Sequence, residues 1–175
     1  MTWDERFASP DYVVPAPMQF LVDLAERLPP GGRMLDLACG SGRHSALFAA
    51  HGWSVTAVDS SAAALALAGS AHSGIATLQR DLTSPEDFPP GPWDLTVVTL
   101  YLDRELLRRI PGARVAIAIP LVDPRDGVRP MNPAYLLESG ELRRIFATGW
   151  EVEHYRETSP APPARSIAEL VALRS

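Results

Sequence analysis

A glycine-rich turn in the first third of the chain carries the residues best suited to hold a ligand. Asp36 lies near the end of an apolar run, Gly40 and Gly42 follow it, and residues 43–51 have the composition of a helix. Glycine reaches backbone conformations closed to other residues and lets a ligand approach the main chain. The order apolar run, glycines and helical segment predicts a buried strand that leads through a binding turn into a helix.

Charge and spacing indicate the kind of ligand. A dinucleotide fingerprint has a third glycine three residues beyond the second, where this chain has Ser45, so a nicotinamide cofactor is disfavoured. Asp36 would repel a phosphate at the turn but suits an ammonium or sulfonium group. S-adenosylmethionine is a ligand of this kind.

Polar residues also follow the next three predicted strands. Asp59 lies 23 positions after Asp36, near the offset expected of a carboxylate that binds ribose hydroxyls. Asp81 ends the third strand, and Thr99 lies in the fourth. One such aspartate is more often a turn former or a helix cap than a ligand contact. Four strand ends that converge on one crevice, together with the glycine turn, favour a nucleoside-type cofactor site.

The turn closely resembles motif I of the class I S-adenosylmethionine-dependent methyltransferases, with Ala38 where that family usually has its first glycine. The opening Trp-Asp-Glu-Arg-Phe and the run 140–146 ahead of Trp150 resemble the tellurite-resistance-like branch of bacterial class I methyltransferases. In the family, the acid after the third strand lies beside the adenine. The resemblance implies these cofactor contacts: Asp36, Ala38, Gly40, Asp59, Ser60, Asp81, Leu82 and Thr99.

Hydrophobic patterning predicts an α/β fold. We expect a Rossmann-like class I methyltransferase sheet, mostly parallel with a C-terminal antiparallel hairpin, and helices on both faces. The connection before the fifth strand holds barely two helical turns, which predicts thin packing beneath it. The expected strands are 34–38, 53–59, 75–82, 95–100, 114–119, 150–155 and 167–173, and the expected helices 17–28, 43–51, 60–71, 103–110 and 138–146, with loops over 83–92 and 120–137.

The 175 residues predict one methyltransferase domain, with an N-terminal arm and helix over 1–30 and a core over 31–175. The arm 1–17, which bears aromatic residues, is either a segment packed over the sheet edge or a lid that closes on the cofactor. The chain is 46% hydrophobic and 21% charged, as in ordinary globular proteins.

Composition also bears on partners and location. The net charge of −5 argues against a nucleic-acid partner. No apolar run is long enough to span a membrane, and the N-terminus lacks a signal-peptide pattern, so we expect a cytoplasmic location. Cys39, the only cysteine, is expected to be a small packing residue, and no metal is expected. The oligomeric state stays open.

The acceptor is the least determined part of the prediction. Methyl transfer from a sulfonium has a neutral leaving group, so no catalytic base is obligatory and no catalytic residue is assigned. A neutral acceptor would need a base, for which His44 and Tyr101 are the nearest candidates. The alternative interpretation of His44 is a histidine on the surface of its helix.

The loop 120–137 follows the fifth strand and should emerge beside the cofactor crevice. It carries Arg125, Arg129 and Asn132, which are suited to hold a small anionic or soft nucleophile. Alternatively, the two arginines are solvated or paired with Asp123 and Asp126. The leading prediction is a small-molecule methyltransferase; the alternative is a domain that binds S-adenosylmethionine with weak or no transferase activity.

Overall fold

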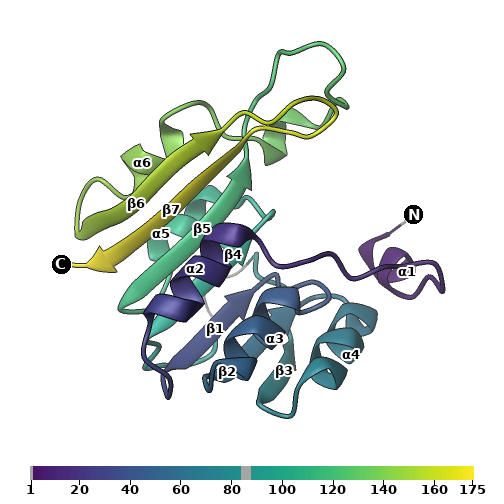
Figure 1. The fold of residues 1–175 in the computed structure, drawn as a ribbon, viewed down its shortest axis with the longest axis vertical. Helices are drawn as coiled ribbons and strands as arrows, with labels where there is room; N and C mark the ends of the chain where they lie inside the picture. Colours follow the sequence, from purple (N-terminus) through teal and green to yellow (C-terminus); the bar gives the residue numbers. More distant parts are fainter. Residues whose placement is uncertain (1, 84–87) are drawn as a thin grey trace.

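A seven-stranded sheet forms the middle layer of the computed structural model, which describes residues 2–83 and 88–175 (Figure 1). The strand order is β3-β2-β1-β4-β5-β7-β6. The pairs among β1 to β5 are parallel, and β7 is antiparallel to both β5 and β6. The strands are β1 (Arg33–Leu37), β2 (Ser54–Asp59), β3 (Ile75–Gln79), β4 (Leu95–Thr99), β5 (Arg114–Pro120), β6 (Trp150–Thr158) and β7 (Ile167–Arg174).

The strand order reverses between β1 and β4. β1 pairs with β2 on one side and with β4 on the other, so the chain winds outward in both directions from this point. In open α/β sheets, ligands bind at the carboxyl ends of the strands beside such a reversal. The predicted fold class, including the C-terminal antiparallel hairpin, is confirmed.

Helices cover both faces of the sheet. In Figure 1, α2, α3 and α4 lie over one face, and α5 and α6 lie behind the other. The helices are α1 (Trp3–Phe7), α2 (Gln19–Arg27), α3 (Arg43–Ala50), α4 (Ala62–Ala71), α5 (Arg104–Arg109) and α6 (Glu141–Ile145), and a 3-10 turn spans Pro133–Tyr135. The sequence did not predict α1, and α2 begins two residues after Pro17.

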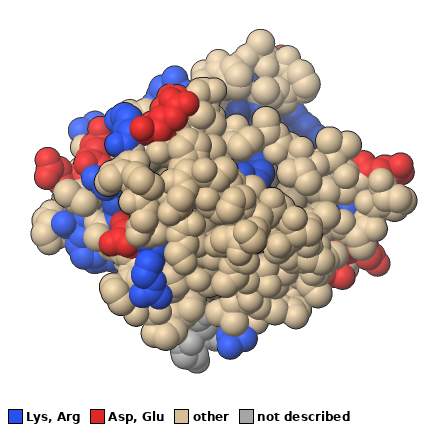
Figure 2. All heavy atoms as spheres, turned by 60° about the horizontal axis from the view of Figure 1, so that its bottom comes forward, with Lys and Arg blue, Asp and Glu red and all other residues tan. Residues whose placement is uncertain are grey.

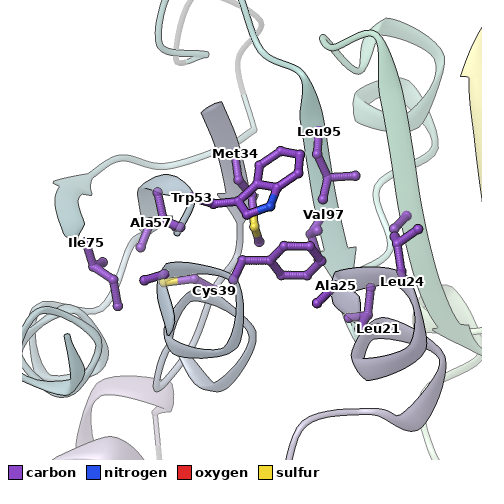
Figure 3. Packing of buried hydrophobic residues seen from close by; sticks show 14 of the residues in the cluster. Leu21, Leu24, Ala25, Met34, Cys39, Trp53, Ala57, Ile75, Leu95 and Val97 are labelled. Atoms are coloured by element: carbon purple, nitrogen blue, oxygen red, sulfur yellow. The ribbon is translucent and has the colours of Figure 1, made fainter. Parts of the chain in front are cut away.

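The core under α2 and α3 is mainly apolar. Figure 3 shows Leu21 and Leu24 of α2 facing Leu95 and Val97 of β4. Cys39 lies in the same core, where burial raises the pKa of its thiol well above the ordinary range. The expected packing role of Cys39 is therefore confirmed.

The opposite face is better filled than the short connection before β5 predicted. Leu106 and Leu107 of the two-turn helix α5 are 1% exposed. Leu142 of α6 and Phe146 just after it are completely buried in the same cluster. The expectation of thin packing was wrong because α6, from much later in the chain, supplies the volume that α5 lacks.

Charge is distributed unevenly over the molecule. From His44 to Gln79 the only Asp, Glu, Lys or Arg is Asp59. Figure 2 shows the resulting broad face without charged residues. The edge strand β3 is five residues long and uncharged, whereas the opposite edge strand β6 has nine residues, several of them charged, and a register shift between Val152 and His154. In the described residues, no helix is long and apolar enough to cross a membrane.

Candidate cofactor site

The turn after β1 has a left-handed backbone at alternate residues. φ is +54° at Ala38, +54° at Gly40 and +73° at Gly42. A Cβ on Gly42 would lie 2.5 Å from the Cβ of Ala68 in α4, so glycine is required there by packing as well as by conformation. Ala38 adopts the same conformation with a side chain, at a strain energy of about 1–2 kcal/mol.

Asp59, the last residue of β2, fixes this turn. Its Oδ2 accepts a hydrogen bond from the Gly40 amide at 2.8 Å, and its Oδ1 accepts one from the Ser61 amide at 2.9 Å. Ser61 in turn caps α4 by accepting a hydrogen bond from the Ala64 amide. These hydrogen bonds orient the Asp59 carboxylate. Because Asp59 is only half-buried, its oxygens retain lone pairs for a ligand.

Asp36 lies beneath the turn and is almost completely buried. The Ser45 hydroxyl donates a hydrogen bond to its Oδ2 at 2.6 Å, while its Oδ1 is buried without a hydrogen-bond partner. Burial raises the pKa of Asp36 to about 7; the Ser45 hydrogen bond opposes this rise, and the charge of Asp59 adds to it. An unpaired buried carboxylate oxygen is unfavourable, so the site suits a cationic ligand group.

The N-terminal arm closes over the start of α4. The Asp4 carboxylate accepts hydrogen bonds from the Ser61 hydroxyl at 2.7 Å and from the Ala63 amide at 3.0 Å. These contacts lower the pKa of Asp4, with the Ser61 hydrogen bond as the main cause. The capping box formed by Thr2 and Glu5 begins α1 and holds Asp4 in position. This Thr-x-x-Glu pattern is the sequence signal that could have predicted α1.

The arm also contacts the glycine turn. The Phe7 ring lies 3.2 Å from the position that a Cβ on Gly40 would take. The Tyr12 hydroxyl donates to the Ser41 hydroxyl at 3.1 Å, and the Arg43 guanidinium donates to the Ala16 carbonyl at 3.1 Å. The arm therefore covers the turn rather than a distant sheet edge. No local pattern in the sequence predicts these contacts.

His44 is buried between α2 and β4, so the interpretation as a helix-surface histidine was wrong. Its Nε2 accepts a hydrogen bond from the Met18 amide at 3.2 Å, which places the ring proton on Nδ1, 3.3 Å from the Thr99 hydroxyl. Burial, with a smaller contribution from Arg43, lowers its pKa to about 3. Because both ring nitrogens are engaged, His44 is poorly placed to act as a base.

Tyr101, the other candidate base, is half-buried beyond the end of β4. Burial raises the pKa of its hydroxyl, and the neighbouring charges of Asp103, Asp81 and Asp59 and the Tyr135 hydroxyl raise it further. Tyr101 therefore holds its proton at neutral pH, which disfavours it as a base.

Two strained residues flank the reversal of strand order. Ala38 follows β1 with φ +54°, and Leu100 follows β4 with φ +59° and half of its surface exposed. The Leu100 amide is held by the Ala118 carbonyl at 2.8 Å. Among the described residues, no other non-glycine residue has a positive φ. Strain of this kind gathers at functional sites.

The remaining predicted contacts lie at the ends of neighbouring strands. Ser60 is exposed beside Asp59. Asp81 is exposed two residues beyond β3, where its Oδ1 accepts a hydrogen bond from the Thr83 amide at 3.1 Å. Leu82 is buried, and Thr99 ends β4. Asp36, Ala38, Gly40 and Asp59 surround one turn directly.

The predicted acceptor residues are placed differently. The Arg125 guanidinium forms two hydrogen bonds with Asp123, at 2.8 and 2.6 Å, and also binds Ser166 and the Pro160 carbonyl. These bonds hold the loop in place and agree with the alternative interpretation, in which Arg125 is paired with an aspartate of the loop. Arg129 is exposed, and the Asn132 carbonyl oxygen caps the 3-10 turn at the Ala134 amide.

Comparisons with known proteins agree with this geometry. Residues 34–110 match a family model described as a methyltransferase domain. No curated protein sequence matches the chain significantly. Among solved structures, TehB of Haemophilus influenzae is 21% identical with a TM-score of 0.76, and the match covers 99% of this chain and 67% of TehB.

Two further structures give similar matches. The magnesium protoporphyrin IX methyltransferase of Synechocystis with bound SAH is 20% identical, with a TM-score of 0.68 and coverage of 90% of this chain and 83% of that one. A TehB-like S-adenosylmethionine-dependent methyltransferase of Corynebacterium glutamicum is 18% identical, with a TM-score of 0.61 and coverage of 89% and 86%. The predicted fold is thereby confirmed, and the family match and these structures agree with the predicted enzyme class and cofactor.

Proposed function

We propose that this class I S-adenosylmethionine-dependent methyltransferase acts on a small-molecule acceptor, an anionic or soft nucleophile. One observation carries the assignment of the cofactor. Two carboxylates from adjacent strands, Asp36 and Asp59, bracket a glycine turn, and one oxygen of Asp36 is buried without a partner. Such a site favours a ligand with a cationic end and a hydroxyl-bearing end.

The residues fit S-adenosylmethionine. The free Oδ1 of Asp36 would accept a hydrogen bond from the methionine ammonium group, and Asp59 would accept hydrogen bonds from the ribose hydroxyls. Arg43, half-buried at the start of α3, is the cation nearest the turn in sequence and would face the methionine carboxylate. Ala38, Gly40, Ser60, Asp81, Leu82 and Thr99 are proposed to line the rest of the cofactor site.

The chain contributes position and desolvation to the reaction. When bound, S-adenosylmethionine supplies an activated methyl group and a neutral leaving group. Phe7 and Tyr12 cover the glycine turn and exclude water from it. Asp59 holds the turn and the start of α4 in fixed register, so the cofactor-binding groups need no rearrangement. Neither His44 nor Tyr101 is suited to remove a proton from the acceptor, so an acceptor that needs no base is favoured.

Calorimetric titration with S-adenosylhomocysteine tests the cofactor site. We expect Asp59→Ala to weaken binding by about 1–3 kcal/mol, because a ribose hydroxyl loses its carboxylate partner. Asp94→Ala is the matched control. Asp94 also accepts a backbone hydrogen bond, from Arg33 at 2.7 Å, but it lies just ahead of β4, at the amino ends of the parallel strands and away from the cofactor site. The affinity of the Asp94→Ala variant for S-adenosylhomocysteine should stay unchanged.

Circular dichroism must show that both variants are folded. Equal affinities of folded Asp59→Ala and wild type would remove Asp59 from the site. Binding of NAD, with no response to S-adenosylhomocysteine, would overturn the proposed function.

A further inference from the structure

We infer that the acceptor is a small thiol with an apolar, preferably aromatic, body. The inference rests on the proposed function and names the acceptor class for the same site. It assigns acceptor binding to an apolar wall beside the glycine turn. We define the apolar wall as Val13, Val14, Leu100, Met131 and Tyr135.

The first observation is where large hydrophobic side chains are exposed. Seven are exposed in the described residues: Trp3, Val13, Val14, Leu100, Val122, Met131 and Tyr135. All seven lie in only three segments, namely the arm, the residue after β4 and the loop after β5. Scattered single exposures are ordinary, but their concentration in segments at one edge of the sheet marks a binding surface.

The contacts of these segments place the wall at the cofactor site. Tyr12 is hydrogen-bonded to Ser41 of the turn, and Ala16 is hydrogen-bonded to Arg43 at the start of α3, so Val13 and Val14 lie between two segments held at the cofactor site. Leu100 follows β4 at the reversal of strand order. Arg104, three residues beyond Tyr101, donates a hydrogen bond to the Leu136 carbonyl at 3.2 Å, so the segment that carries Tyr135 packs beside the residues after β4.

The second observation is that Arg125, one of the two arginines of the loop, is already engaged within the protein. Asp123 binds Arg125 through both carboxylate oxygens, and Ser166 and a backbone carbonyl occupy further guanidinium hydrogens. These bonds lower the pKa of Asp123 below its usual range, with the Arg125 hydrogen bond as the main cause. A small inorganic oxyanion held by Arg125 would have to break this pair, whereas an apolar body meets the apolar wall without doing so.

The third observation concerns the proton. Tyr101 retains its proton and both nitrogens of His44 are hydrogen-bonded, so a neutral alcohol or amine acceptor finds no base in either. A thiol needs none, because a few per cent of it is thiolate at pH 7 and the thiolate is intrinsically strongly nucleophilic.

The transfer balances without another reactant. The thiol releases its proton to solvent, and the thiolate electron pair forms the new sulfur–carbon bond to the methyl group. The bond between this carbon and the cofactor sulfonium breaks, and its electron pair stays on sulfur. The products are a methyl thioether and S-adenosylhomocysteine.

An acceptor panel tests the inference. Benzyl mercaptan, 2-mercaptoethanol and selenite represent an apolar thiol, a polar thiol and a small oxyanion, and S-adenosylhomocysteine release is measured. We expect kcat/KM for benzyl mercaptan to exceed that for 2-mercaptoethanol by about tenfold or more, since burial of an aromatic body is worth that factor.

Variants then locate the binding surface. The double variant Met131→Ala, Tyr135→Ala should raise the KM for benzyl mercaptan at least about fivefold and leave S-adenosylhomocysteine affinity intact. Calorimetric binding of benzyl methyl sulfide, the product, to the S-adenosylhomocysteine complex should weaken by a similar factor, which provides a readout independent of turnover. Glu151→Ala, an exposed change on β6, is the control.

The outcomes separate the two claims. Failure to bind S-adenosylhomocysteine overturns the proposed function itself. Binding of S-adenosylhomocysteine with equal or better use of selenite or 2-mercaptoethanol, or with unchanged product affinity in the double variant, overturns only the acceptor class.

Discussion

The buried carboxylate of Asp36 should make the stability of the ligand-free protein fall as pH rises. Its pKa is raised from 3.8 to about 7, chiefly by burial. The unfolded chain ionises Asp36 near its ordinary pKa, whereas the folded chain keeps it protonated up to about pH 7. The stability that protonated Asp36 contributes is thus fully present below its ordinary pKa of 3.8 and is lost as the pH rises through its folded pKa of about 7. Three pH units at about 1.36 kcal/mol each give a loss of about 4 kcal/mol.

Asp36→Asn removes the titration and keeps an acceptor for the Ser45 hydroxyl. Urea unfolding of wild type and variant from pH 5 to pH 8 isolates the effect, because all other titrating groups are shared. Relative to the variant, the wild type should lose about 2 kcal/mol between pH 5 and pH 7 and little more above that. A difference that is constant over the whole range would refute the reasoning.

Saturating S-adenosylhomocysteine provides an internal check. Its ammonium group, placed against Asp36, would favour the ionised carboxylate and lower its pKa. The pH dependence of the difference between wild type and variant should therefore flatten when the ligand is bound. A difference that keeps its slope in the ligand complex would argue that the ammonium binds elsewhere.

Two further predictions follow from the turn and the arm. Ala38→Gly should raise the free energy of unfolding by about 0.5–1 kcal/mol in urea titrations, since relief of left-handed strain exceeds the added entropy of the unfolded chain; a less stable variant would show that Ala38 is not strained. Hydrogen exchange of residues 2–17 should slow on binding of S-adenosylhomocysteine, and Asp4→Ala, which removes the contact with α4, should abolish most of this slowing. Equal exchange with and without ligand would mean that the arm is plain packing.

The sequence predicted the sheet, its strand ends and the glycine turn because these depend on local patterns. The alternation of a strand can be recognised within a few residues of sequence, and so can a glycine turn such as that at Gly40 or an acid after a strand such as Asp59. Asp59 ends β2 and is hydrogen-bonded to the glycine turn, while its contact with a ribose stays a prediction. The connection before β5 shows the limit of such patterns, since α6, far away in the chain, fills the volume beside α5.

The errors arise where meaning depends on contacts between distant segments. Nothing local to His44 signals that the amide of Met18, 26 residues earlier, occupies its Nε2. Likewise Arg125 looked suited to an anion, but residues 35 to 41 positions later share it with Asp123. In both cases, a polar side chain of a type common in catalytic or binding sites instead forms hydrogen bonds between two segments of the chain.

The two ends of the sheet differ in how they would behave at high protein concentration. β6 carries charged residues and a bulge, and an incoming strand from another molecule would meet both repulsion and a broken register. β3 has neither, and in the part of the chain that the structure describes its protection is its short length of five residues. Aggregation should therefore begin at β3, and substitutions that extend this strand past Gln79 would shorten the shelf life of the protein while leaving its fold intact.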